Sequence, residues 1–385
     1  MARQQKALIA GGGIGGLAAA IALRQAGFDV KVFEREAQPS EIGAGVAIWP
    51  NGARALQSLG VKGGWVALKR LTLRTWDGRR LLEPPLDALQ QRYGWGMIMA
   101  HRADLHSDLR GALGDGPIRA GARVNGLDQD EKRVSVLLDN GDEESGDLLV
   151  GADGLRSAVR SHLLRDGDPT YQGFTAWRAV TRDAMVEMEP DTGCNWWGRG
   201  GEFLAFPLAG RRTYWAGTAN AVRSAKPGRG GHKQDVIERF RGWAEPIEAL
   251  IDATEPQAVL RTDIYDRPPA RHWSLGRVTL LGDAAHPMTP SQGQGACQAL
   301  EDAVVLGECL VEEPDIPRAL REYERRRLPR ANRIVRLSRQ ASRAVQSESR
   351  LICRLRDTSV SLLPWPLMVR ALNSTLGGPA RASGS

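Results

Sequence analysis

Residues 6–16 read Lys-Ala-Leu-Ile-Ala-Gly-Gly-Gly-Ile-Gly-Gly, a short apolar run that leads into a glycine-rich turn. A segment rich in small, helix-forming residues follows at 17–25, and an alternating β-rich segment follows at 29–34. The order of strand, tight turn, helix and strand predicts a βαβ unit that begins near residue 6.

Three glycines of this turn have a spacing that suits a dinucleotide. Gly11 permits the tight turn, Gly13 lets the backbone approach a pyrophosphate, and Gly16 lets the helix pack against the strand. The amides at the helix start, from Ile14 onward, would then face the phosphates. Glu34 ends the second strand about 20 residues further on, where a carboxylate accepts hydrogen bonds from ribose hydroxyls and repels a 2′-phosphate. The pattern favours FAD or NAD over NADP, and a glycine-rich turn without a ligand is the alternative.

Two later segments favour FAD over NAD. Residues 151–160 read Gly-Ala-Asp-Gly-Leu-Arg-Ser-Ala-Val-Arg and directly follow an apolar run. Residues 282–296 read Gly-Asp-Ala-Ala-His-Pro-Met-Thr-Pro-Ser-Gln-Gly-Gln-Gly-Ala, at the end of a strand expected over 278–281. Asp283 can accept hydrogen bonds from ribityl hydroxyls, while Gly293 and Gly295 leave room for a flat ring beside the backbone. The helix expected over 296–310 directs its positive end at that ring.

With these three motifs in this order, the chain resembles the FAD-dependent aromatic hydroxylases, the single-component (class A) flavoprotein monooxygenases, over about residues 6–330. The resemblance implies an α/β fold, in which a Rossmann-like FAD-binding domain carries an inserted, mainly antiparallel β-sheet substrate domain and C-terminal helices. It also implies that NADH or NADPH reduces FAD, that O2 is captured as a flavin hydroperoxide, and that an aromatic or polycyclic small molecule is hydroxylated or epoxidised. A reductase or dehydrogenase of the same fold and a non-catalytic flavin-binding partner protein are the alternatives.

The resemblance implies contacts to the nucleotide half of the cofactor. Glu34 and Arg35 would contact the adenosine, and Val124 would meet the adenine through its backbone. Arg102 would approach the phosphate or the ribityl chain. Asp153, together with Arg156, lies in a segment linked to both FAD and the nicotinamide cofactor.

The resemblance also implies contacts to the flavin ring. One set of residues would line the ring: Gly45, Val46 and Ala47. A second set would lie where oxygen is activated: Pro290 and the loop of Gly293, Gln294, Gly295, Ala296 and Cys297. His286 occupies a place in the motif that favours a structural role over general-base catalysis.

The candidates on the substrate side are Tyr214 and Arg178, which together with Pro290 form the predicted catalytic set. Tyr214 falls where urate-type hydroxylases place a residue near the substrate, and a buried structural tyrosine is the alternative. Those relatives carry a substrate-anchoring arginine where this chain has Glu202, which argues against an anionic substrate like theirs. Arg178 could instead hold a carboxylate or keto oxygen, or pair locally. Trp196, Trp197 and Trp215 wall an apolar pocket or belong to the core.

The motifs and the composition divide the chain into four parts. We predict a first part of the FAD-binding domain over 1–170 and a second part over 274–340. Tryptophans and tyrosines recur among short strand-like runs between them, which predicts a substrate-binding sheet over 171–273. A C-terminal helical segment follows over 341–385. Asp-Asn-Gly at 139–141 predicts a β-hairpin turn.

The net charge of +7, from 52 Lys and Arg against 45 Asp and Glu, originates in one segment. Residues 318–356 hold 13 arginines and three acids, and the arginines have helical spacing. This pattern predicts a solvated helix face. A patch for nucleic acid or for an anionic membrane is the alternative, which the lack of interleaved aromatics disfavours.

The remaining composition narrows the class of protein. The four scattered cysteines form no CxxC pair, so neither a disulfide framework nor a metal site is predicted. No stretch approaches roughly 18 uncharged apolar residues, and the N-terminus shows no apolar leader, so integral membrane contact is not expected. We expect a cytoplasmic monomer or homodimer that uses FAD, NAD(P)H, O2 and a small-molecule substrate, and that binds no nucleic acid.

Overall fold

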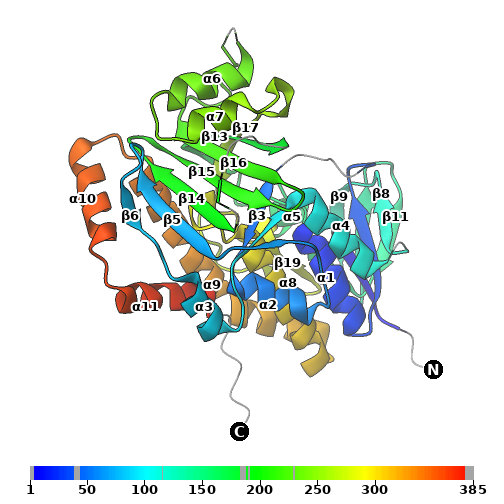
Figure 1. Cartoon of the computed structure of the whole chain (residues 1–385). Coiled ribbons are helices and arrows are strands. Elements are labelled where there is room, and N and C mark those ends of the chain that lie inside the picture. The colour runs from blue at the N-terminus through cyan, green and yellow to red at the C-terminus, as the bar shows by residue number, and fades with distance from the viewer. Residues whose placement is uncertain are drawn as a thin grey trace.

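The structure is a computed structural model that describes residues 4–38, 44–114, 116–182, 188–189, 191–228 and 230–377. Two sheets form separate layers, with a seven-stranded sheet lying above a parallel sheet and its helices (Figure 1). The largest apolar core surrounds the parallel sheet, and smaller cores lie on the two faces of the seven-stranded sheet.

The predicted βαβ unit is confirmed at the centre of the parallel sheet. Its strands, in spatial order, are β18 (Ser274–Leu275), β19 (Val278–Leu280), β12 (Leu148–Gly151), β1 (Lys6–Ala10), β2 (Asp29–Glu34) and β8 (Ile118–Ala120). All neighbours pair in parallel except β18 and β19. Helix α1 (Ile14–Gln25) connects β1 to β2. The apolar run of β1 is almost fully buried, as expected for a strand that is covered on both faces.

Helices cover the parallel sheet, and α1 and α8 pack closely because small side chains meet where they touch. The helices are α2 (Pro50–Ser58), α4 (Arg102–Leu113), α5 (Ala158–Leu164), α8 (Gly295–Glu312) and α9 (Ile316–Val345). A Cβ on Gly307 of α8 would lie 3.1 Å from the Cβ of Ala22 in α1, so the two helices can approach closely. Helix α8 confirms the buried helix that the sequence predicts over 296–310.

Two three-stranded sheets flank this core. One contains β9 (Val124–Gln129), β10 (Val134–Leu138) and β11 (Glu143–Gly146), with the predicted hairpin turn between β10 and β11. Its Gly141 has a φ of +87° and donates its N–H to the carbonyl of Leu138 over 3.1 Å. The other contains β3 (Gly45–Ile48), β7 (Ile98–His101) and β4 (Val66–Ala67).

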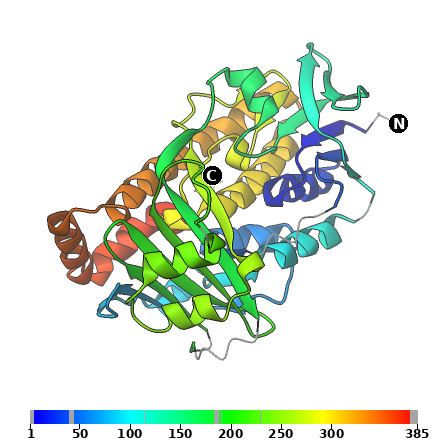
Figure 2. The same ribbon diagram turned by 90° about the horizontal axis from the view of Figure 1, so that it is seen from above.

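The seven-stranded sheet is mainly antiparallel, which confirms the predicted fold class. Its spatial order is β17 (Leu260–Asp266), β13 (Thr170–Arg182), β16 (Arg212–Asn220), β15 (Gly201–Leu208), β14 (Thr192–Trp197), β5 (Arg70–Thr75) and β6 (Arg80–Leu82). Strands β5 and β6 come from within the range 1–170, so this sheet is not formed by residues 171–273 alone. Helices α6 (Gly231–Phe240) and α7 (Ile247–Asp252) and the 3-10 turn η1 (Pro256–Ala258) lie on its outer side (Figure 2).

The last helices that the structure describes are α9, α10 (Arg350–Ser361) and α11 (Trp365–Leu376), and α11 lies near α3 (Leu86–Tyr93). Asp315 caps α9 by accepting a hydrogen bond from the N–H of Arg318 over 3.0 Å. Among the helices that the structure describes, none combines the length and the apolar composition needed to cross a bilayer.

The prediction that the arginine-rich helix is a solvated face is wrong for part of α9. Arg327 is fully buried, and Arg330 and Arg339 form ion pairs with Glu301 and Asp266 at 2.9 Å and 2.8 Å. Carboxylates on α8 and β17 therefore face this side of α9, which sequence spacing alone does not reveal.

Candidate active site

The glycine turn leaves an open space where a phosphate would lie. A Cβ on Gly16 would lie 1.9 Å from the carbonyl oxygen of Gly11, so a side chain there is excluded. Gly11 itself has a φ of +101° and lies against the backbone of Ala152. Nothing surrounds a Cβ on Gly13 within 4 Å, and no side chain caps the N-terminus of α1 that begins at Ile14. Free helix amides beside open space fit an anionic phosphate.

Glu34 lies directly beside this turn. Its carboxylate accepts hydrogen bonds from the N–H of Gly12 over 2.7 Å and from the N–H of Glu36 over 2.9 Å. The carbonyl of Glu34 accepts from the N–H of Ala122 over 2.8 Å, which brings the segment leading to Val124 to the same edge. The side chain of the neighbouring Arg35 is mostly exposed.

Sequence reasoning missed His106, whose ring nitrogen lies 2.8 Å from the carbonyl oxygen of Gly12. His106 is one helical turn after Arg102 on α4, and that i, i+4 spacing is the signal that could have identified it. Both side chains therefore lie on the face of α4 that approaches the glycine turn.

Asp283 lies at the turn η2 (Gly282–Ala284), close to the start of α8. A Cβ on Gly295 would lie 3.9 Å from its Oδ1. Asp283 keeps access to solvent, yet the surrounding protein raises the pKa of its carboxyl, while His286 and Arg102 act in the opposite direction. Asp283 and Gly295 therefore lie side by side, and the charge of Arg102 is near enough to act on the Asp283 carboxyl, as expected if the three residues face one ligand.

The two predicted flavin segments face each other although they are far apart in the sequence. Asn51, which follows β3, donates from Nδ2 to Oε1 of Gln294 over 3.1 Å. The N–H of Trp49 donates to Sγ of Cys297 over 3.3 Å. A Cβ on Gly293 would lie 3.1 Å from Nε1 of Trp49. Segments 45–49 and 293–297 are therefore held together by direct contacts.

Cys297 makes these contacts in its protonated thiol form. Burial raises its pKa to about 12, so it is protonated near neutral pH and does not act as a nucleophile. The preceding residue, Ala296, is half-buried in the first turn of α8. Pro290 begins the short turn η3 (Pro290–Gln292) that leads into the loop, and its side chain is exposed.

The carboxylate of Asp153 is engaged by the helix that follows it. Its Oδ2 accepts hydrogen bonds from the N–H groups of Ala158 and Val159 over 2.7 Å and 3.4 Å at the start of α5. The guanidinium of Arg156 lies 5.6 Å from the ring centroid of Tyr265. This segment contacts the glycine turn through Ala152 and Gly11.

Tyr214 connects the seven-stranded sheet to the predicted flavin segment. A Cβ on Gly45 would lie 2.4 Å from Cδ1 of its ring, so Tyr214 packs directly against β3. Burial raises the pKa of its phenol, Glu202 adds to the rise, and Arg178 opposes it. The raised pKa favours the neutral phenol of Tyr214 near neutral pH.

Arg178 shares the inner face of the sheet with Tyr214. Val180 pairs with Tyr214 across β13 and β16, and Arg178 is two residues from Val180, so its side chain points to the same side. Arg178 is half-buried, and its side chain has no hydrogen bond or ion pair with the residues that the structure describes. The alternative of local pairing is thus not observed there.

Two of the three tryptophans that were candidates for the pocket lie on the outer face of this sheet. Trp196 and Trp215 are buried against Phe203 and the residues of α6 and α7, so they belong to the core. Trp197 lies on the inner face, where Arg356 of α10 lies 5.0 Å from its ring centroid. Glu202 is buried beside it and accepts a hydrogen bond from Nδ2 of Asn195 over 3.2 Å, and burial raises its pKa.

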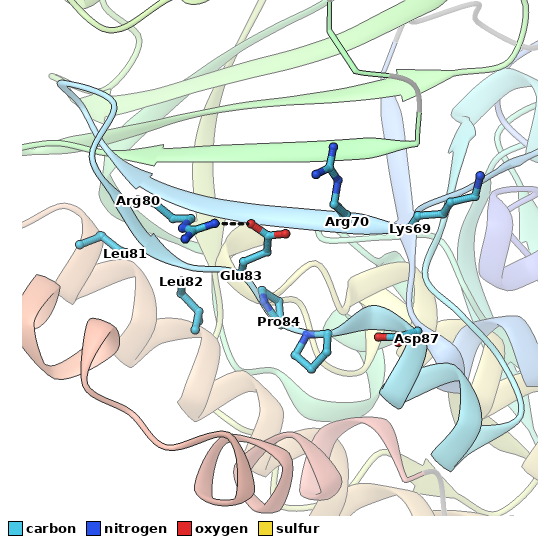
Figure 3. A pocket seen from close by; sticks show the side chains of 9 residues that line it. Lys69, Arg70, Arg80, Leu81, Leu82, Glu83, Pro84 and Asp87 are labelled. Carbon is cyan, nitrogen blue, oxygen red and sulfur yellow. Dashed lines mark hydrogen bonds and ion pairs between the residues drawn. The ribbon is translucent and has the colours of Figure 1, made fainter.

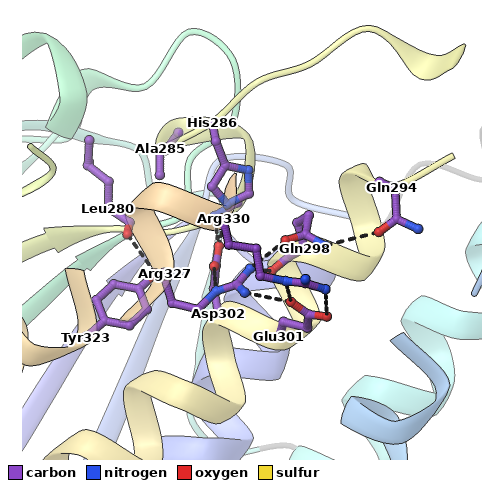
Figure 4. A network of polar contacts seen from close by, with 12 residues as sticks. Leu280, Ala285, His286, Gln294, Gln298, Glu301, Asp302, Tyr323, Arg327 and Arg330 are labelled. Atoms are coloured by element: carbon purple, nitrogen blue, oxygen red, sulfur yellow. Dashed lines mark hydrogen bonds and ion pairs between the residues drawn. The ribbon is translucent and has the colours of Figure 1, made fainter. Parts of the chain in front are cut away.

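A buried polar network connects to residues 293–297, the predicted flavin loop, through Gln294 (Figure 4). Nε2 of His286 lies 2.5 Å from Oδ2 of Asp302, a buried contact that fits the structural role favoured for this histidine. Arg327 donates to Asp302 over 2.7 Å and to Oε1 of Gln298 over 2.7 Å. Gln298 in turn donates to Gln294 of the loop over 3.0 Å. Sequence reasoning missed Arg327 and Gln298.

A cavity of about 510 Å³ lies at the other edge of the seven-stranded sheet, between β5, β6 and the start of α3 (Figure 3). Its three cationic side chains have acidic partners: Lys69 with Asp191, Arg70 with Glu189, and Arg80 with Glu83. It shares no residue with the segments described above, so it is separate from the candidate site.

Three features fit an FAD-binding protein: a glycine turn that opens a βαβ unit, an Asp-bearing turn beside a buried helix, and a sheet that packs against β3 through Tyr214. The family model described as an FAD binding domain matches residues 4–338. An aurachin C monooxygenase/isomerase of Stigmatella aurantiaca is 40% identical over 92% of this chain and 94% of the relative. An FAD-dependent urate hydroxylase of Klebsiella pneumoniae is 35% identical over 86% of this chain and 88% of the relative.

A solved structure agrees with these relatives. The crystal structure of a Klebsiella pneumoniae protein complexed with FAD and uric acid matches with a TM-score of 0.92, at 31% identity, over 98% of both chains. The chain therefore belongs to the class A FAD-dependent aromatic hydroxylase family, and it is a flavoprotein monooxygenase with FAD as its cofactor.

Proposed function

We propose that this chain uses NAD(P)H and O2 to hydroxylate or epoxidise an aromatic or polycyclic small molecule, held between the seven-stranded sheet and the flavin. The observation that carries this proposal is the contact of Tyr214 with Gly45, beside an Arg178 without a described partner. The substrate-facing sheet thus meets the flavin segment at a point where a cation is available to bind a ligand.

The described residues fit FAD, and each part of the cofactor has candidate partners. The pyrophosphate would lie at Gly13 and the α1 amides, and the ribose would lie at Glu34, whose oxygens each retain a further lone pair. Asp283 and Arg102 would hold the ribityl chain or phosphate. The flavin ring would lie against residues 45–47 and 293–297, which are in contact with each other. When bound, FAD supplies the redox chemistry that activates O2.

The inner face of the sheet suits an aromatic substrate. Leu204 and Phe206 lie on this face beside Tyr214 and contribute to an apolar cluster with Ala47 and Trp49. Such a surface binds a ring and excludes water from it. Arg178 would fix a carboxylate, keto or phenol oxygen of the ring through a charge-assisted hydrogen bond. Tyr214 would position the ring as a neutral hydrogen-bonding group.

The function is tested with the purified protein. A visible spectrum reports bound FAD, and oxidation of NADH and of NADPH is then followed across a panel of aromatic compounds under isotopically labelled O2. We expect a compound that stimulates oxidation and gains one labelled oxygen atom. Stimulated oxidation that yields a reduced product without the label would instead identify a reductase, and failure to take up FAD would contradict the cofactor site.

Replacing Arg178 by Met is expected to raise KM for the substrate about tenfold or more, because a hydrogen bond to a charged group contributes about 1.5–3 kcal/mol. Arg178→Lys keeps the charge and should recover part of the loss. FAD content should stay unchanged, since Arg178 lies on the sheet and not in the flavin segments. Steady-state oxidation of NAD(P)H with the identified substrate measures both effects.

The matched control is Arg241→Met, at the end of α6 on the outer side of the same sheet, where the side chain is exposed. It should leave KM unchanged. Equal KM increases in the two variants would assign the effect to lost positive charge in general and would contradict a contact between Arg178 and the substrate.

A further inference from the structure

The C-terminal helices expose a set of large apolar side chains. This leucine patch consists of Leu351, Ile352 and Leu355 on α10, Leu362 and Leu363 in the connection, and Leu367 on α11. Leu362 is 72% exposed, Leu351 66% and Leu355 59%. Exposed leucines occur singly on many surfaces, but a contiguous group marks an interaction site.

The patch has a defined direction because α10 is fixed on its opposite side. Leu351, Leu355 and Leu362 are spaced by four and seven residues, which places them on one side of a helix. Cys353 is buried, and the guanidinium of Arg356 lies over Trp197 of β14. Helix α10 thus lies at the edge of the molecule (Figure 1). It contacts the sheet on one side, and its leucines are exposed to solvent.

The charge around the patch is positive. Residues 343–370 contain five arginines and two acids. Both acids have partners, since Asp357 pairs with Arg356 at 2.8 Å and Glu348 accepts from Nδ2 of Asn220 over 2.8 Å. Arg350 and Arg354 are exposed on α10 beside the leucines. A second copy of the same patch would set these arginines against each other, so charge complementarity favours an anionic occupant.

We propose that the leucine patch binds the surface of an anionic lipid bilayer. The leucines enter the boundary between headgroups and acyl chains, and Arg350 and Arg354 lie at the level of the lipid phosphates. Helices α10 and α11 have 12 residues each, too few to span a bilayer, so the contact is interfacial. This interaction goes beyond the proposed oxygenation and does not depend on it.

The test uses the full-length FAD-bound protein and vesicle flotation. Vesicles of phosphatidylcholine mixed with phosphatidylglycerol should carry the protein, vesicles of phosphatidylcholine alone should carry much less, and added salt should release it. The variant Leu351→Ser/Leu355→Ser/Leu362→Ser should lower the partition coefficient at least about tenfold. The variant Arg350→Glu/Arg354→Glu should lower the partition coefficient by about tenfold or more on anionic vesicles, and should leave it unchanged on vesicles of phosphatidylcholine alone.

All five changed side chains are exposed, so FAD content and the thermal midpoint should match those of the unmodified protein and verify folding. The control Leu275→Ser/Val311→Ser removes apolar side chains of similar exposure from other elements and should leave binding unchanged. The proposal is overturned if anionic vesicles do not carry the protein, or if the leucine variant binds as well as the unmodified protein. It is also overturned if light scattering shows a dimer that the leucine variant converts to a monomer, since a second copy would then occupy the patch.

Discussion

Replacing Arg327 by Met should destabilise the fold by about 3–5 kcal/mol, since removing one partner from a buried ion pair leaves a charge uncompensated. Arg327 is fully buried and donates to Asp302 over 2.7 Å and to Glu301 over 2.6 Å. Methionine fills a similar volume but supplies no donor to either carboxylate. Because Arg327 also binds Gln298, which donates to Gln294 of the flavin loop, the variant should lose FAD more readily as well. Urea unfolding followed by tryptophan fluorescence measures the first effect, and retained FAD absorbance after gel filtration measures the second.

Arg325→Met is the matched control, two residues earlier on the same helix. Arg325 is 73% exposed and pairs with Glu322 at 2.7 Å. An exposed ion pair contributes about 0–1 kcal/mol, so this variant should unfold close to the unmodified protein. Similar losses in both variants would show that arginine at any position of α9 matters and would contradict the special role of the buried network.

The same network predicts a pH dependence. Burial raises the pKa of the Asp302 carboxyl, but His286 and Arg327 outweigh burial and lower it to about 2, below its usual 3.8. A lowered pKa adds stability that is complete above the usual value and is lost as the pH falls toward the folded-state value. The free energy of unfolding should therefore decrease between about pH 4 and about pH 2. It should decrease less steeply in Arg327→Met, where the pKa of Asp302 returns toward its usual value. If the free energy of unfolding fell equally steeply with pH in both proteins, the acid sensitivity would originate in other carboxylates.

The cofactor side of the fold was predictable from sequence because its determinants are local. The glycine turn, α1 and Glu34 lie within 24 residues of one another on a single βαβ unit, so spacing alone places them. The start of α8 was also predictable, since its glycines and its strand are adjacent in the chain. In each case short-range backbone constraints determine the geometry.

The buried network and the substrate side depend on pairings across long stretches of chain. Arg327 is one of 13 arginines at helical spacing, and only packing against α8 distinguishes it from Arg325. Tyr214 meets Gly45 because of the register of the seven-stranded sheet, which β5 and β6 join from another part of the chain. Register over such separations carries no local signal, which is why the sequence left Trp196 and Trp215 open to a pocket as well as to the core, where a sheet tryptophan is more often found.

Replacing Gly16 by Ala should cost about 3 kcal/mol or more and abolish retention of FAD, because the new Cβ overpacks a site that cannot expand. It would lie 1.9 Å from the carbonyl oxygen of Gly11, a backbone atom fixed by the hydrogen bond from the N–H of Gly11 to the carbonyl of Phe33. Helix α1 must then move away from the turn, and its free amides no longer lie beside Gly13. The visible spectrum of the purified variant reports FAD, and urea unfolding reports stability.

Gly111→Ala is the control that separates steric conflict from the change of residue itself. Gly111 also lies within a helix, α4, but a Cβ there meets nothing within 4 Å. Alanine at this position should stabilise the helix by up to about 1 kcal/mol, because it loses less backbone entropy than glycine on folding. FAD should remain bound. Retention of FAD by both Gly16→Ala and Gly111→Ala would contradict this prediction. The close approach of α1 to the turn would then not form the phosphate site, and groups other than the helix amides would bind the cofactor phosphates.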